Sequence, residues 1–244
     1  MLRTISIGPL LLQTPGLALL AGAWMSLTVI ERRAKELSLN VEAISALVFY
    51  SLVAGIIGSR LAYAAGFPAV YWENPLSLFA LNTTTLTPLE GFVIGSVVAL
   101  AFGQRKGLAL RPTLDALTPG LAAFMVAWGV SHVLSGDAFG TASDVPWAIT
   151  LWGKARHPVQ IYETLLALGI FILVWKYPLK KPGAGINFLY FLSLSALSRL
   201  FLEAFRGDSL VWLGRVRAAQ VISLLIVLIS LWLMRAWVSA ETDA

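Results

Sequence analysis

Three charged residues in one apolar segment could bind an anion. Arg199 and Glu203 are four residues apart and Arg206 is seven residues from Arg199, so in a helix all three project on one face. An ion pair between Arg199 and Glu203 is one interpretation. Arg206 then lacks a partner in its own helix, which favours an external anion such as a phosphate, because a guanidinium offers a planar fork of donors.

A second polar group introduces the preceding apolar segment. It reads Arg156-His157-Pro158-Val159-Gln160-Ile161-Tyr162-Glu163, with Pro158 suited to a first helical turn. A helix start with free N–H groups beside Arg156 and His157 is a natural anion site. The alternative is interfacial anchoring, with Tyr162 in an aromatic belt and Glu163 favoured by the helix dipole. Spacing alone favours anchoring.

Other ionisable residues lie in or beside apolar segments, namely Arg60, Glu90, Asp115, His132 and Asp137. Such a group inside a membrane costs at least about 2.5 to 3.5 kcal/mol on insertion scales, so it usually faces a cavity or a partner. The chain has two histidines, His132 and His157, which argues against a metal site built on histidines. A general acid or base role is open to either.

The composition places these residues in a membrane. The chain of 244 residues is 58% hydrophobic and 13% charged, against about 25% charged residues in a soluble domain, which excludes an ordinary water-soluble globule. It has no cysteine, so a substrate would have to supply any reacting thiol. Its net charge of +5 comes from basic clusters between apolar runs, which indicate membrane topology and no nucleic-acid partner.

Seven apolar segments are long enough to cross a bilayer, which predicts an all-α integral membrane protein. We expect the spans at about 4–30, 43–66, 86–103, 114–134, 160–177, 185–204 and 215–234, within a single polytopic domain over residues 1–244. A cleaved signal peptide is the alternative for the first segment, but its apolar stretch is too long. Gly55, Gly58, Gly91 and Gly95 are interpreted as helix-packing positions.

The cationic loops predict the orientation. Those on one side of the seven spans contain Arg32, Arg33, Lys35, Arg105, Lys106, Arg111, Lys176, Lys180, Lys181 and Arg235. The positive-inside rule places this side in the cytoplasm, so we expect the N-terminus outside and the C-terminus in the cytoplasm.

These polar groups resemble the motifs of a known protein family, and the resemblance covers nearly the whole chain. The Arg156 to Glu163 element is close to the arginine-(histidine or proline)-proline-x-glutamine-leucine-tyrosine-glutamate element of the prolipoprotein diacylglyceryl transferases, seven-span enzymes of the bacterial plasma membrane. Arg199-xxx-Glu203-xx-Arg206-x-Asp208 is similar to another stretch of that family. Further matches are Ser6-Ile7-Gly8-Pro9, Gly58-x-Arg60-xx-Tyr63, Asp115 with Pro119, and Gln220.

Two departures fall on the family's characteristic elements. Leu89 stands where the family has the histidine of a histidine-glycine-glycine-leucine element. In the signature glycine-arginine-x-glycine-asparagine-phenylalanine-x-asparagine-x-glutamate, Gly129 replaces the arginine and Asp137 replaces the glutamate. His132 and Ser135 stand at the asparagine positions.

The resemblance implies transfer of a diacylglyceryl group from phosphatidylglycerol to the lipobox cysteine thiol of a preprolipoprotein, at its signal-peptide region, with release of glycerol phosphate and no cofactor. The phosphate needs cations, for which Arg60, Arg199 and Arg206 are candidates. The thiol needs a base, and we hypothesise that His132 or Glu90 replaces the missing histidine. Glu90 is one residue past that position and is therefore turned by about 100 degrees on the helix.

The expected catalytic residues are therefore His132, Glu90 and Arg199. The expected substrate-binding residues are Arg60, Asp137, Arg156, His157, Gln160, Tyr162, Glu163, Glu203 and Arg206. The competing hypothesis is a catalytically altered or inactive paralogue that binds phospholipid. A transporter would favour repeats or paired broken helices, which the sequence does not show. An intramembrane serine protease has candidates in Ser59, Ser131 and His132 but no second ordered set of partners.

Overall fold

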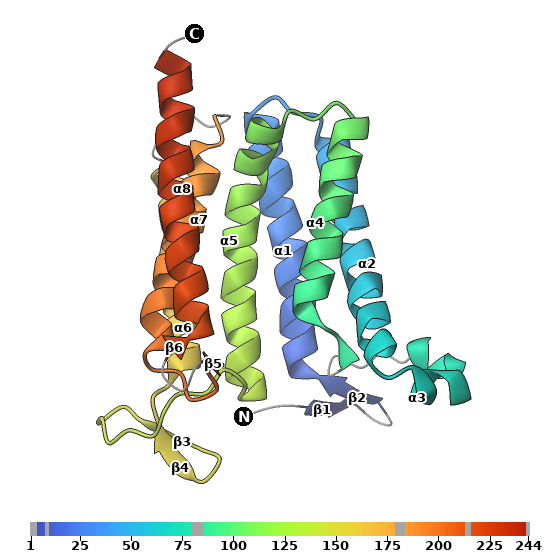
Figure 1. Cartoon of the computed structure of the whole chain (residues 1–244), viewed down its shortest axis with the longest axis vertical. Helices are drawn as coiled ribbons and strands as arrows, with labels where there is room; N and C mark the ends of the chain where they lie inside the picture. Colours follow the sequence, from blue (N-terminus) through green and yellow to red (C-terminus); the bar gives the residue numbers. More distant parts are fainter. Residues whose placement is uncertain (1–3, 8–9, 80–84, 179–183, 213–215, 243–244) are drawn as a thin grey trace. The chain divides into compact units, whose positions relative to one another are not determined.

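The computed structural model describes residues 4–7, 10–79, 85–178, 184–212 and 216–242, and in these residues the chain is helical apart from three short hairpins (Figure 1). The helices are α1 (Thr14–Glu36), α2 (Val41–Gly66), α3 (Pro68–Glu73), the 3₁₀ helix η1 (Pro75–Phe79), α4 (Pro88–Arg105), α5 (Leu110–Ser135), α6 (Val159–Lys176), α7 (Ile186–Glu203) and α8 (Ala218–Thr242). The antiparallel hairpins pair β1 (Thr4–Ile7) with β2 (Leu10–Gln13), β3 (Ile149–Leu151) with β4 (Lys154–Arg156), and β5 (Val211–Trp212) with β6 (Val216–Arg217). The predicted cations Lys180 and Lys181 and the residues Gly8 and Pro9 lie outside the described ranges.

Six of the described helices are long and apolar enough to cross a membrane, namely α1, α2, α5, α6, α7 and α8. This supports a multi-pass integral membrane protein. The remaining predicted span coincides with α4 (Pro88–Arg105), which is not among these six helices. The number of seven spans and their orientation stay predictions.

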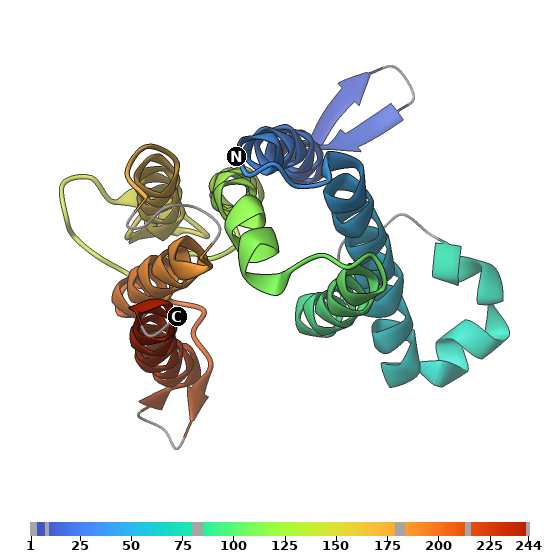
Figure 2. The same cartoon turned by 90° about the horizontal axis from the view of Figure 1, so that it is seen from above.

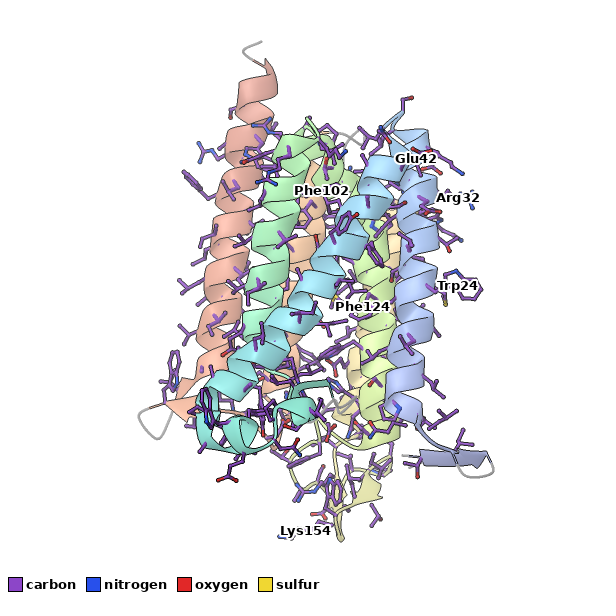
Figure 3. All side chains as sticks on the ribbon, turned by 90° about the vertical axis from the view of Figure 1, so that its right-hand side faces the viewer. Trp24, Arg32, Glu42, Phe102, Phe124 and Lys154 are labelled. Carbon is purple, nitrogen blue, oxygen red and sulfur yellow. The ribbon has the colours of Figure 1, made fainter. Side chains whose placement is uncertain are left out.

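The first predicted span is wrong at both ends. Residues 4–7 and 10–13 form a hairpin, and α1 begins at Thr14 with Pro15 in its first turn. Pro15 lacks an N–H, which is no loss at a helix start. The helix continues through the cationic residues to Glu36. Trp24, labelled in Figure 3, projects outward from α1 with 77% of its surface exposed, as expected of a side chain that contacts lipid.

The chain divides into two compact units. The large unit consists of residues 1–37 and 111–244, and the small unit of residues 38–110. In the large unit, Ala122 of α5, Ile170 and Val174 of α6 and Phe191 of α7 form a hydrophobic core. Seen along the helices, α7 lies between α6 and α8 (Figure 2). The β3–β4 and β5–β6 hairpins lie at one end of these helices and the C-terminus lies at the other (Figure 1).

The small unit is built on close contact between α2 and α4. A Cβ atom added at Gly55 would lie 2.9 Å from the carbonyl oxygen of Gly91, and one added at Gly95 would lie 2.9 Å from that of Ser51. Backbone atoms cannot rotate away from such contacts. The interpretation of these glycines as packing positions is therefore confirmed.

A carboxylate from α5 caps α7 in the large unit. Asp115 is 2% exposed, and its two oxygens accept hydrogen bonds from the N–H groups of Gly185, at 2.9 Å, and of Phe188, at 3.0 Å. The first N–H groups of a helix have no partner within it, and a negative charge beside them is favourable. Asp115 therefore ties the start of α7 to α5.

Replacing Asp115 by alanine is expected to lower the midpoint of thermal unfolding in detergent. Two buried N–H groups would lose their acceptor, at about 1–3 kcal/mol for each donor left unpaired. The matched control is Asp144→Ala, since Asp144 is exposed in a loop of the same unit. Equal midpoints for the two variants would contradict the capping role.

Candidate functional site

A histidine and a carboxylate meet where α5 ends and α6 begins. Nδ1 of His132, in the last turn of α5, lies 2.7 Å from Oε2 of Glu163, in the second turn of α6. Both side chains are largely buried, with 18% and 17% exposed. The ring of Trp128 packs against the imidazole at 5.5 Å between centroids. A base oriented by a carboxylate is a common arrangement for activating a nucleophile.

A buried carboxylate lies beside two arginines at the end of α7. Glu203 is 0% exposed, and its Oε2 is 3.2 Å from Nη2 of Arg199 and 4.0 Å from Nε of Arg206. The Arg199 side chain is 40% exposed, so it can also reach a ligand. The ion pair between Arg199 and Glu203 is confirmed.

Arg206 was expected to project on the face of the α7 helix without a partner in that helix, and the structure pairs it outside the helix. Arg206 lies beyond the end of α7, and its guanidinium donates two hydrogen bonds to the Asp208 carboxylate, at 2.9 and 2.6 Å. The bend after the helix brings these two residues together, which a continuous helix would not do. Arg217 of β6 donates to the carbonyl oxygens of Glu203 and Arg206 and so holds the same turn.

The two groups lie in neighbouring parts of the large unit. The rings of His157 and Tyr162, at the start of α6, pack on Phe205, two residues after Glu203. One end of the large unit therefore combines a histidine–carboxylate pair with a partly exposed arginine.

The start of α6 is tied to a neighbouring loop. Arg156 donates to the carbonyl oxygens of Gly140, at 3.0 Å, and Leu151, at 3.2 Å, and lies over the ring of Phe139. The expectation of free N–H groups is wrong for Val159 and Ile161, which donate to the carbonyl oxygens of His157 and Pro158. These contacts favour a structural role for this turn over an anion site.

Polar groups around this turn remain open to a ligand. Gln160 is 1% exposed, and neither end of its amide has a hydrogen-bond partner among the described residues. The same holds for Nδ1 of His157, whose ring packs on Phe205. Tyr162 accepts a hydrogen bond of 2.6 Å from Trp147. Asp137 is exposed in the loop after α5. Orphaned buried polar atoms mark places for water or a ligand.

Two predicted site residues belong to the small unit. Arg60 of α2 donates to the carbonyl oxygens of Ser77 and Leu78 in η1, at 2.7 and 3.1 Å, and of Thr85, at 3.4 Å, and so ties α2 to η1 and to Thr85. Glu90 is exposed in the first turn of α4, next to Leu89, which is 72% exposed. Within the described residues of either unit, no group of three or more histidine, aspartate or glutamate side chains could hold a metal.

These features describe a polytopic membrane protein whose large unit contains a histidine–carboxylate pair and a partly exposed arginine. A family model described as prolipoprotein diacylglyceryl transferase matches residues 3–236. The chain belongs to this family.

Curated relatives agree with this assignment, and each is named phosphatidylglycerol–prolipoprotein diacylglyceryl transferase. The relative from Legionella pneumophila (strain Corby) is 31% identical, with 93% of each chain covered. The relative from Thermus thermophilus is 27% identical, with 95% of this chain and 96% of its own covered. The relative from Bordetella parapertussis is 30% identical, with 88% and 85% covered.

Proposed function

We propose that this protein transfers the diacylglyceryl group of phosphatidylglycerol to the lipobox cysteine thiol of a preprolipoprotein. The observation that carries the proposal is the largely buried His132–Glu163 pair in the same unit as the partly exposed Arg199. Family membership and the names of the relatives support the same reaction.

His132 acts as the general base in this proposal. With Glu163 ionised, Nδ1 carries the proton that it shares with the carboxylate, and Nε2 is left to take the proton of the thiol. The sulfur then attacks the terminal glycerol carbon of the diacylglyceryl group. The carbon–sulfur bond forms as the bond from that carbon to the phosphate oxygen breaks, and the electron pair leaves with glycerol phosphate.

Arg199 stabilises the charge on the departing phosphate. Its guanidinium stays charged and can donate two parallel hydrogen bonds to phosphate oxygens. Glu203 orients this guanidinium from the buried side. We assign Arg206 to holding the turn with Asp208, and Gln160, His157, Tyr162 and Asp137 to the substrate-binding surroundings. Arg60 and Glu90 remain candidates from the small unit.

The proposed setting is the bacterial plasma membrane, with α4 as the seventh span of one polytopic domain. The N-terminus is then outside, the C-terminus is cytoplasmic, and the signal-peptide region of the substrate approaches from the membrane. Because the chain has no cysteine, single cysteines introduced at each end can be tested for labelling from outside. Labelling of the C-terminal one in intact cells would overturn the orientation.

The second candidate is a phospholipid-binding paralogue without transferase activity. It is favoured by Leu89, an apolar and exposed residue where the family has its histidine. Such a protein would bind phosphatidylglycerol through Arg199 and release no product.

A turnover assay separates the two candidates. The purified full chain in detergent is mixed with phosphatidylglycerol and a lipobox peptide, and both the mass of the peptide and the release of glycerol phosphate are followed. Gain of one diacylglyceryl group with equal release of glycerol phosphate supports the transferase. Lipid binding without either product would overturn it.

A further inference from the structure

Helices α5 and α6 meet at Gly129 without room for a side chain. A Cβ atom added there would lie 2.6 Å from Oγ1 of Thr164, 2.9 Å from its Cα and 3.1 Å from its backbone nitrogen. Rotation of the threonine side chain could relieve only the first contact. The other two involve backbone atoms of α6, so any larger residue must separate the helices.

This contact lies next to the His132–Glu163 pair. His132 follows Gly129 by three residues on α5, and Glu163 directly precedes Thr164 on α6. Ordinary van der Waals contact begins at 3.4 Å, so a methyl group at position 129 requires the two backbones to separate by about 0.5 Å. The 2.7 Å hydrogen bond would then reach about 3.2 Å, the upper end of the normal range.

We infer that Gly129 is a positioning residue that brings the general base His132 into contact with Glu163. Glycine at 129 and histidine at 132 are both departures from the family's signature. They then act together, since the absence of a side chain at 129 lets His132 come within hydrogen-bond distance of the Glu163 carboxylate. This inference rests on the proposed function for its catalytic consequence, but the contact itself can be tested without turnover.

The test compares Gly129→Ala with Gly169→Ala. Gly169 lies in α6, and a Cβ atom added there meets nothing within 4 Å, so it is a matched control. The first readout is the ¹⁵N spectrum of the histidine-labelled protein in detergent, which contains two imidazoles, assigned with a His157→Gln variant. We expect the Nδ1–H signal of His132 to keep its wild-type position in Gly169→Ala and to move toward that of a longer, weaker hydrogen bond in Gly129→Ala.

The second readout is kinetic. We expect Gly129→Ala to lower kcat roughly tenfold or more with little change in KM for phosphatidylglycerol, because an oriented base acts in the transition state. In a Glu163→Ala background the same change should cost much less, since the contact that it lengthens is already absent there. A defect of equal size in both backgrounds would indicate general loss of packing and would overturn the inference.

If the Gly129→Ala protein does not accumulate in cells, the double variant Gly129→Ala with Thr164→Ala is tested instead. The double variant removes the 2.6 Å contact with Oγ1 and keeps the contacts with backbone atoms. Retention of the wild-type Nδ1–H signal in the double variant, or in Gly129→Ala, would overturn the inference. The wild-type protein could release no glycerol phosphate while the Nδ1–H signal still moves in Gly129→Ala. That result would uphold the positioning role of Gly129 and would overturn the proposed transferase function.

Discussion

Replacement of His132 by alanine is expected to lower kcat by about 10²- to 10⁴-fold, the usual contribution of a general base, while phosphatidylglycerol should still bind. The physical reason is that the thiol must lose its proton as the carbon–sulfur bond forms, and Nε2 of His132 is the acceptor in our proposal. The measurement is single-turnover formation of the lipidated peptide, together with lipid binding by the same preparation.

Glu163→Gln should have a smaller effect of the same kind. An amide oxygen can still accept the Nδ1–H bond but does not stabilise the imidazolium that forms. Asp144→Asn, in an exposed loop of the same unit, is the matched control for removal of one carboxylate. Loss of turnover in Glu90→Gln together with full turnover in His132→Ala would show that the base is Glu90.

Replacement of Arg199 by alanine is expected to weaken the binding of phosphatidylglycerol strongly and to remove turnover. The lipid phosphate loses the cation that we assign to it, and truncating one member of a charge pair between binding partners typically costs about 2–5 kcal/mol in binding. The fully buried Glu203 also loses its 3.2 Å partner, which affects the stability of the fold. The measurement is the affinity of the detergent-solubilised protein for phosphatidylglycerol.

Arg199→Lys and Arg235→Ala are the controls for this prediction. The lysine keeps the charge and loses the planar fork, so we expect intermediate affinity. Arg235 is exposed on α8, and its loss removes the same charge without touching the site. Affinity in Arg199→Ala equal to that in Arg235→Ala would rule out Arg199 as the phosphate ligand.

The His132 and Arg199 variants together distinguish the two candidate functions. If the protein is a transferase, both His132→Ala and Arg199→Ala lose product formation, and only Arg199→Ala also loses lipid binding. A phospholipid-binding paralogue shows the Arg199 effect alone, since it has no turnover for His132 to support.

The apolar segments alone determined most of the helices. The predicted ranges 43–66, 160–177 and 185–204 correspond to Val41–Gly66, Val159–Lys176 and Ile186–Glu203. Hydrophobic runs of this length can be recognised from the sequence because they depend on a local property, the free energy of placing each side chain in lipid. The spacing of Arg199 and Glu203 also allowed their ion pair as one interpretation, because residues four apart are neighbours on one helix.

Tertiary structure decided the pairings between segments. His132 and Glu163 are 31 positions apart, and their contact depends on how closely α5 and α6 pack at Gly129, a distance that no local pattern encodes. Arginine is a common phosphate ligand, yet in the structure Arg156 and Arg60 donate to backbone carbonyl oxygens. A guanidinium donates to whichever acceptors lie within reach of it in the folded chain. The sequence therefore determines where the arginines are, and the packing of the chain determines which acceptors they bind.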